Sequence, residues 1–328
     1  MFDVAKHAGV SHQTVSRVLN DLPGVAAATR ERVRQAMAEL NYAPSPTARA
    51  MARRRSGSIG LIQAGRPDYG PSSAALGFNE AAREAGYAVS QASMRALDAD
   101  ALTQAVHRLV LQRVEAIVLI SGEREGVDVL RGIDAGVPLV AVASEGGPGL
   151  HRVSFDQAAG AHLATEHLIG LGHRRIAHVA GPADSMDAAE RRRGFAGALA
   201  AHGLEQREPL AGDWLAASGH AAGRRLLDDG WATAVFVGND QMSLGLLSAC
   251  HAAGVRVPDD LSVVGFDDIP EAAFFTPALT TMRQDFDTLG RDIMATVVDV
   301  LRDEASAPDR TARVPELVVR ASTGTPRG

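Results

Sequence analysis

From Ser58 onward, short apolar runs of strand length alternate with helix-length segments, and this alternation restricts the fold more than any other feature. Alternating strands and helices predict parallel sheets with helices on both faces, and two successive series predict two similar lobes. The expected strands are 58–63, 87–92, 116–120, 138–142, 151–155, 175–180, 234–238, 261–266 and 316–320. The expected helices are 73–86, 98–113, 156–171, 188–203, 217–229 and 240–254.

The first 55 residues lack this alternation and predict short helices instead. A helix is expected over 3–9, with Asp3 as its N-terminal cap and Gly9 in the left-handed turn that ends it. A second helix over 11–19 follows at once, and Ser11 is suited to cap it.

A third helix, over about 27–40 and beginning at Thr29 or just before, completes a small core with Val33, Met37 and Leu40. On the second helix Val15, Val18 and Leu19 share one face. The opposite face carries His12, Gln13, Ser16 and Arg17. Two short helices joined by a tight glycine turn, with a third to close the core, are typical of a helix-turn-helix.

Charge is distributed unevenly along the chain. Residues 1–55 carry nine basic and four acidic side chains, a net charge of +5, which leaves −11 for residues 56–328. A basic head on an acidic body favours a head that binds a polyanion. Gln and Arg side chains on an exposed helix can hydrogen-bond adenine and guanine edges in the major groove of DNA. The alternative is a small helical bundle whose polar face is merely solvated.

Composition excludes several other classes of protein. The chain has 328 residues, enough for two or three packed units, and no apolar run of the roughly 18 residues that a membrane span needs. Its N-terminus has no apolar signal core, and Cys250 is its only cysteine, so we expect a cytoplasmic protein without a disulfide. HExxH, P-loop and nucleophile-elbow motifs are absent from the sequence, so we expect no enzyme, metal or cofactor.

The segments DVAKHAGVSHQTVSRVLN and VAAATRERVRQAMAELNYAP resemble the DNA-binding head of the LacI/GalR family of transcriptional regulators. The resemblance implies that His12, Gln13 and Arg17 contact DNA bases. His12 stands where the lactose-operon member of the family has tyrosine, so the preferred operator need not be the same. The implied DNA-binding residues are Ser11, His12, Gln13, Thr14, Ser16, Arg17, Asn20, Thr29, Met51 and Arg53.

In the family, the segment equivalent to TARAMARRRSG is a hinge that becomes helical only on DNA and inserts an apolar side chain into the minor groove. Met51 occupies the position of that side chain. The other interpretation is a flexible basic linker, which we expect in the absence of DNA. The predicted domains are a helix-turn-helix over 1–44, a hinge over 45–56 and a sugar-binding and dimerisation domain over 57–328.

The resemblance continues through GHRRIAHVAGP, GDWLAASG, VGNDQMSLG and LSVVGFDDIPEAAFFTPALTTMRQDF. It implies a periplasmic-binding-protein-like body with one lobe at about 57–155 and 287–310 and the other at about 156–284 and 311–325. The predicted fold class is therefore an N-terminal all-α helix-turn-helix domain joined to an α/β two-lobed domain with two parallel, doubly wound sheets.

Polar side chains suited to a sugar follow two expected strands, where ligands of such sheets bind. Asn239 follows AVFVG, and Asp267 follows LSVVGF. The resemblance assigns Arg191, Asn239 and Asp267 to sugar hydroxyls, Phe155 and Trp214 to an apolar wall, and Gln284 and Phe286 to a crossover strand. Alone, each could be a cap or a core residue; together at strand ends they favour a binding site. Asp213 and Asp268 are expected to cap turns or support their neighbours.

The first lobe departs from the lactose-operon member, since Ala143 replaces a ligand-binding aspartate and Ile120 or Ser121 an asparagine. From the resemblance as a whole, we expect a transcriptional repressor that is released from DNA by a small sugar, a β-galactoside or a related disaccharide. The sequence after the last strand has no apolar heptads, which favours a homodimer. The alternatives are a regulator with another glycoside or with a corepressor, a sugar receptor without DNA function, and a sugar-processing enzyme.

Overall fold

The computed structural model describes residues 1–19, 22–42, 56–64, 68–94, 98–143, 150–302 and 311–327. The chain divides into two compact units, Met1–Ser58 and Ile59–Gly328. Within the described residues, no helix is long and apolar enough to cross a membrane.

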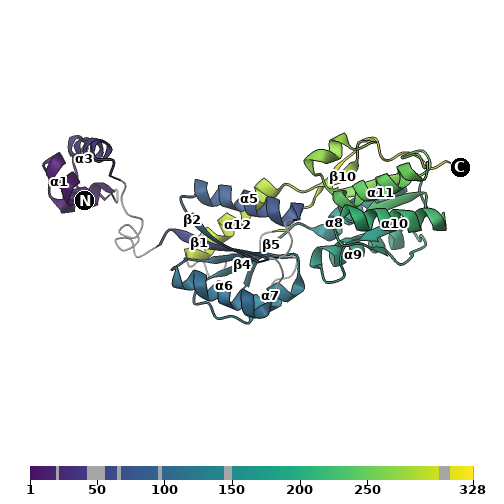
Figure 1. Ribbon diagram of the computed structural model, residues 1–328, viewed down its shortest axis with the longest axis horizontal. Coiled ribbons are helices and arrows are strands. Elements are labelled where there is room, and N and C mark those ends of the chain that lie inside the picture. The colour runs from purple at the N-terminus through teal and green to yellow at the C-terminus, as the bar shows by residue number, and fades with distance from the viewer. Residues whose placement is uncertain are drawn as a thin grey trace. The chain divides into compact units, whose positions relative to one another are not determined.

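The N-terminal unit is a bundle of three helices (Figure 1), namely α1 (Phe2–Ala8), α2 (His12–Leu19) and α3 (Ala27–Glu39). Gly9 ends α1 with a φ of 62°, in the left-handed region that the sequence predicts. The Thr14 amide donates to Ser11 Oγ at 3.2 Å, so Ser11 caps α2. The core of the bundle consists of Val4, Ala5, Ala8, Val15, Val18, Val33 and Ala36.

Two expectations for this unit are wrong. Asp3 is not the cap of α1, because the helix begins one residue earlier, and its N-cap, Met1, makes no side-chain cap bond. Leu40 does not enter the core either: it lies past the end of α3, where it is 41% exposed, and Ala36 packs beside Val33 instead.

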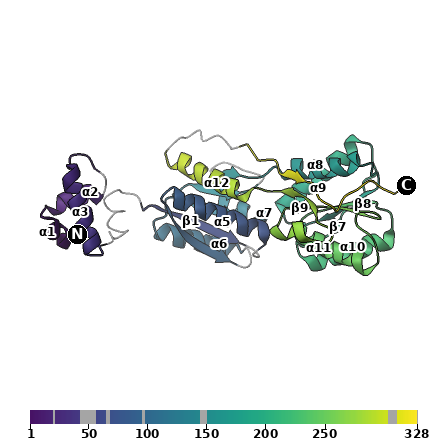
Figure 2. The same cartoon turned by 90° about the horizontal axis from the view of Figure 1, so that it is seen from above.

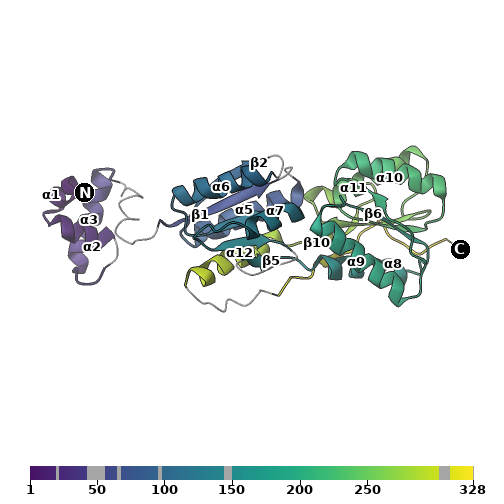
Figure 3. The same ribbon diagram turned by 90° about the horizontal axis from the view of Figure 1, so that it is seen from below.

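The second unit begins with a five-stranded sheet in the order β2-β1-β3-β4-β5. Its strands are β1 (Ser58–Ala64), β2 (Ala88–Met94), β3 (Ile117–Ile120), β4 (Leu139–Val142) and β5 (Leu150–Val153). Two helices cover each face (Figures 1 and 3): α5 (Tyr69–Glu84) and α12 (Phe286–Leu301) on one, α6 (Ala99–Leu111) and α7 (Arg124–Arg131) on the other. We call this sheet and its four helices the first lobe.

The second lobe contains a six-stranded sheet in the order β11-β10-β9-β8-β6-β7. Its strands are β6 (Ile176–Ala180), β7 (Leu210–Ala211), β8 (Ala234–Val237), β9 (Ser262–Asp267), β10 (Thr280–Arg283) and β11 (Glu316–Val318). One face packs on α8 (Gln157–Gly170) and α9 (Met186–Ala201), and the other on α10 (Ala216–Asp229) and α11 (Asp240–Ala252). A 3₁₀ helix, η1 (Pro270–Phe274), follows β9.

The two sheets are parallel as predicted except at one edge, where β11 runs antiparallel to β10. The reason is the path of the chain. It leaves β10 for α12, which packs in the first lobe, and on its return it enters the second sheet from the end at which it left. The sequence reading also missed β7, β10, α7 and α12 as elements.

The segments that connect the two lobes lie together (Figure 2). Phe155 forms a parallel bridge with Arg313, whose carbonyl accepts from the Asp156 amide at 2.8 Å. The Arg313 amide donates in turn to the Ser154 carbonyl at 3.3 Å. These connections lie where the carboxyl ends of the strands of both sheets meet, which is where a doubly wound fold places its ligand.

Candidate functional site

A cavity of about 320 Å³ lies between the two lobes, within the range of small-molecule sites. Most of the residues that line it lie at or just after the carboxyl ends of strands of both sheets. All seven ligand-binding candidates from the sequence are among them, namely Phe155, Arg191, Trp214, Asn239, Asp267, Gln284 and Phe286. The fold therefore gathers at one place residues that are up to 131 positions apart in the chain, as Phe155 and Phe286 are.

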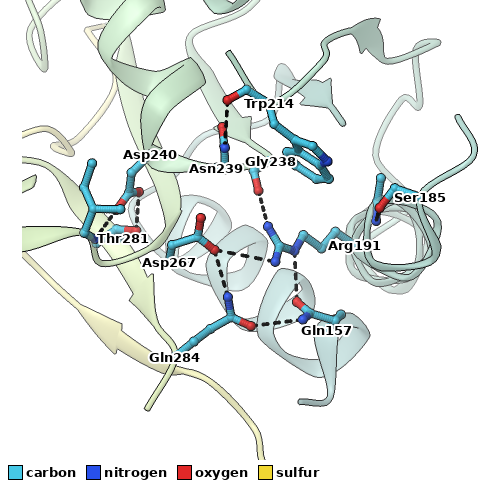
Figure 4. A network of polar contacts seen from close by, with 12 residues as sticks. Gln157, Ser185, Arg191, Trp214, Gly238, Asn239, Asp240, Asp267, Thr281 and Gln284 are labelled. Carbon is cyan, nitrogen blue, oxygen red and sulfur yellow. Dashed lines mark hydrogen bonds and ion pairs between the residues drawn. The ribbon is translucent and has the colours of Figure 1, made fainter. Parts of the chain in front are cut away.

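Four buried side chains form a closed network that we call the polar ring (Figure 4). Arg191 Nε donates to Gln157 Oε1 at 2.9 Å, and Gln157 Nε2 donates to Gln284 Oε1 at 3.0 Å. Gln284 Nε2 donates to Asp267 Oδ1 at 2.8 Å, and the same oxygen lies 3.6 Å from Arg191 Nη2. Each member fixes the orientation of the next, so the ring presents preorganised polar groups to the cavity.

Arg191 is 4% exposed, and the ring is only part of what compensates for its burial. Its Nη1 donates to the carbonyl of Gly238, directly after β8. Its guanidinium lies 3.8 Å from the centre of the Phe266 ring and 5.4 Å from that of Trp214. Because an unpaired buried charge is costly, these contacts hold the guanidinium in one place.

The carboxyl of Asp267 titrates in an unusual range. Burial raises its pKa to about 7, although the nearby Arg191 charge opposes this shift. Its φ of 114° is also unfavourable for a residue with a side chain, and such strain is concentrated at functional sites. Among the described residues no donor reaches its second oxygen, Oδ2, which is therefore available to a ligand hydroxyl.

Trp214 is positioned by its own backbone and by a glycine. Its φ is 71°, and the turn is closed by the Leu215 amide, which donates to Asp213 Oδ1 at 2.9 Å. The indole lies against Gly181, where an added Cβ would come within 2.1 Å of the ring. Asn239 holds the same turn, because its Nδ2 donates to the Trp214 carbonyl at 3.1 Å.

Two further carboxylates support this wall from behind. Asp240 accepts from Thr281 Oγ1 at 2.6 Å and from the Ile269 amide at 2.9 Å, and burial raises its pKa well above the ordinary value. Asp268 accepts from Arg283 at 2.7 Å and from Arg320 at 2.6 Å. Both therefore tie β9 and β10 together at the point where Asp267 enters the cavity.

The first-lobe side of the cavity is largely apolar. Phe286 meets Tyr69 and Phe155 edge to face, with ring centres 5.7 and 5.5 Å apart. Ala74, Ile120, Val142, Ala143 and Leu289 extend its apolar part, and the polar side chains of Asp68, Ser121 and Glu123 also line this side. The expectation that Gln284 and Phe286 lie on a crossover strand is wrong, because Gln284 follows β10 and Phe286 begins α12.

The second helix of the N-terminal unit presents the face that the sequence predicts. Ser11, His12, Gln13 and Arg17 are exposed, whereas Thr14, Ser16 and Thr29 are half-buried. Arg17 Nη2 donates to the Pro23 carbonyl at 2.6 Å, and the His12 ring lies 5.5 Å from that of Phe2. The remaining candidates, Asn20, Met51 and Arg53, lie outside the described residues, as does most of the proposed hinge.

Comparison with known proteins decides the family. Residues 1–45 match the model of bacterial regulatory proteins of the lacI family, and residues 165–323 match the periplasmic binding protein-like domain. The chain is 34% identical to the lactose operon repressor of Escherichia coli (strain K12) over 99% of its own length and 91% of that protein. The chain belongs to the LacI family.

Solved structures of similar LacI-family proteins agree over almost the whole chain. The lac repressor dimer bound to operator and the anti-inducer ONPF matches with a TM-score of 0.87 and 34% identity, over 98% of each chain. The complex of the transcriptional regulator CelR with cellobiose matches with a TM-score of 0.75, also at 34% identity and 98% of each chain. The predictions of the family and of the fold class are confirmed.

Sequence reasoning missed several polar residues of this LacI-family cleft, and two of them lie in or beside the polar ring. Gln157 joins Arg191 to Gln284 in the polar ring, and Ser185 lines the cavity where α9 begins. The available signal was position, since both stand at the start of a helix that follows a strand. Neither residue type indicates a ligand by itself. Among the described residues, no group of three or more His, Cys, Asp or Glu side chains could hold a metal ion.

Proposed function

We propose that this LacI-family chain is a sequence-specific DNA-binding repressor whose operator affinity is controlled by a small sugar, a β-galactoside or a related disaccharide. The observation that carries the proposal is the combination of a helix-turn-helix unit with a cleft whose polar ring lies beside an apolar wall. The supporting relatives are transcriptional regulators, one of them solved with operator and one with cellobiose.

For DNA binding, we assign base recognition to the exposed face of α2. Gln13 and Arg17 have the paired donors and acceptors that read adenine and guanine edges. The bond from Arg17 to the Pro23 carbonyl must break before its side chain can reach a base, so we expect this contact only without DNA. A dimer would place two such helices on a palindromic operator, and the dimeric lac repressor complex supports this arrangement.

For sugar binding, we assign the hydroxyls to the polar ring and to Asn239, and the C–H face of the sugar to Trp214 and Phe155. Asp267 Oδ2 is an acceptor for a hydroxyl, and Asn239 Oδ1, which caps α11 at 2.9 Å from the Met242 amide, has a second lone pair. The apolar first-lobe wall would contact the remainder of a disaccharide or glycoside.

The two sites would be linked through the connections between the lobes. Gln157 and Gln284 each stand beside such a connection, and both belong to the polar ring. A sugar that engages both the ring and the first-lobe wall would therefore fix the relative orientation of the lobes. We expect the sugar to act as an inducer that weakens DNA binding. The alternative is a corepressor, which would strengthen DNA binding.

Two measurements on the intact chain test this function. DNA selected from a random pool should contain a palindrome, and Arg17→Ala should lose the preference for it. A thermal-shift screen should find one or more sugars that raise the melting temperature, because a ligand of the folded state stabilises it. Sugar binding without DNA binding would favour a receptor, and turnover of a chromogenic glycoside would favour an enzyme.

A further inference from the structure

Anions in clefts between α/β lobes are bound mainly by guanidinium groups and by the free amides at helix N-termini. In this cleft the guanidinium donors already have partners within the protein. Arg191 is the one basic residue among the described residues that line the cavity, and its guanidinium contacts Gln157, the Gly238 carbonyl and Asp267. A phosphate or carboxylate could reach this cation only by displacing its existing partners.

In the second lobe, the backbone amides at helix N-termini also have partners. At the start of α9 the Ala188 amide donates to Ser185 Oγ at 3.3 Å, and Asp187 lies in the first turn. At the start of α11 the cap is Asn239, with Asp240 in the first turn. A carboxylate in the first turn offsets the positive end of the helix dipole, so neither terminus offers an unsatisfied site to an anion.

Helix starts in the first lobe and at the connections carry acidic residues as well. Asp68 stands at the N-cap position of α5 and Glu123 at that of α7, where they place negative charge without accepting a cap hydrogen bond from the helix. Asp156 caps α8 and Asp285 caps α12, where their carboxylates accept from backbone amides at 2.8 and 2.9 Å. The cleft is thus bordered by helix termini that already carry their own negative charge.

The charges of the side chains that line the cavity also disfavour an anion. Six described lining residues are acidic, against the single arginine: Asp68, Glu123, Asp184, Asp187, Asp213 and Asp267. Low-dielectric walls strengthen the resulting negative potential. An anionic ligand would enter against this potential, whereas a neutral or cationic ligand would not.

A contact between the lobes adds to the negative potential of the cleft. The Met186 amide of the second lobe donates to the Gly122 carbonyl of the first at 3.0 Å. Glu123 and Ser185 form an isolated antiparallel β-bridge between their backbones. This contact brings Glu123 near Asp184, and partial burial together with that charge raises the pKa of Glu123. A ligand phosphate here would increase the repulsion between the lobes, and an amino group would reduce it.

We propose that the effector of this cleft is an uncharged or amino-substituted sugar, and that phosphorylated sugars and sugar acids are rejected. This inference rests on the proposed sugar-responsive function and narrows its ligand class.

The test is calorimetric titration of the intact chain with ligands that share a skeleton. One set is galactose, galactosamine, galacturonate and galactose 6-phosphate, the second is the matching glucose set, and lactose and cellobiose are compared with lactobionate and cellobionate. We expect a neutral or amino member to bind at least about tenfold more tightly than its anionic counterpart, and the ratio to shrink in high salt.

Tighter binding of a phosphate or an acid than of its neutral parent would overturn the inference, while the sugar-responsive function would stand. If no sugar of any charge binds a chain that still binds DNA, that function fails and the inference fails with it.

A double variant tests the cause directly. Asp184→Asn with Asp187→Asn removes two charges from the cavity wall, and we expect the affinity for the 6-phosphate relative to its parent sugar to rise about tenfold. Asp228→Asn, on the exposed surface of α10, is the matched control and should leave the ratio unchanged. The melting temperature reports whether each variant is folded. An unchanged ratio in a folded double variant would contradict the assignment.

Discussion

The two walls of the cleft are built on opposite principles. The second-lobe wall is polar, and Arg191, Asp267 and Asn239 are nearly inaccessible and held by several contacts each. The first-lobe wall presents mainly small and apolar side chains such as Ala74 and Ala143, with Asp68 and Glu123 at the starts of its helices. A polar network rejects any ligand that leaves one of its groups unpaired, whereas an apolar surface discriminates weakly. Recognition of one sugar ring should therefore reside in the second lobe, and tolerance in the first.

The largest effect is expected from Arg191→Ala. The substitution removes the donor to Gln157 Oε1 and to the Gly238 carbonyl and the cation beside the buried Asp267. Sugar affinity should therefore fall at least about a hundredfold and the free energy of unfolding by about 3–5 kcal/mol. Calorimetry and urea unfolding measure the two quantities. Arg192→Ala, at an adjacent position 42% exposed, is the control and should change neither much.

If Arg191→Ala does not fold, Arg191→Lys keeps the charge but loses the planar fork, and it should still weaken binding more than about tenfold. Normal sugar affinity in either folded variant would contradict the role given to the polar ring.

Trp214→Ala should reduce sugar affinity about ten- to a hundredfold, because it removes the aromatic surface against the sugar and leaves the hydrogen bonds of the polar ring in place. Trp231→Ala is a matched control, since Trp231 is the other tryptophan and packs under Arg207 at 4.1 Å, outside the cavity. In a Trp231→Phe background all tryptophan emission comes from Trp214, so a sugar titration should change it. Equal losses in the two alanine variants would place the sugar elsewhere.

The pH dependence of binding should report Asp267. Its pKa of about 7 means that a proton must leave before the carboxylate can accept from a sugar hydroxyl. Affinity should therefore rise with pH, by up to about tenfold per unit below pH 7, and level off above it. Asp187 and Asp68 contribute to the raised pKa, and Arg191 opposes it. Asp267→Asn should remove the slope, and a slope that persists in this variant would assign it to another group.

The smallest effect is expected on the first-lobe wall. Ala143→Ser adds one hydroxyl at the cavity, and affinity for a methyl glycoside should change less than about threefold. Affinities for disaccharides with different second sugars should change more than that of the methyl glycoside. A loss as large as that of Trp214→Ala, measured by the same titration, would mean that the two walls contribute equally.

The sequence predicted those features whose signal is local. Alternating apolar runs revealed most strands, and Asn239 and Asp267 were found because each directly follows such a run. β10 was missed because its segment TTMR has no apolar run, and its threonines are buried through hydrogen bonds such as that of Thr281 to Asp240. The antiparallel β11 depends on a chain path between lobes, which no local pattern encodes.

The internal connections of the site could not be read from the sequence either. The ring from Arg191 through Gln157 and Gln284 to Asp267 joins residues on separate helices and strands, so it exists only once the second sheet and its helices have formed. The positive φ of Trp214 was equally hidden, because its cause is a turn closed by Asp213 and room provided by Gly181.

The most direct test of the central claim is reciprocal linkage between the sugar and DNA. Operator affinity is measured by fluorescence anisotropy with and without saturating sugar, and sugar affinity by calorimetry with and without saturating operator. The account predicts that each ligand weakens the other by the same factor, as a coupling free energy between two sites requires. Sugar and operator that bind the same chain without changing each other's affinity would contradict it.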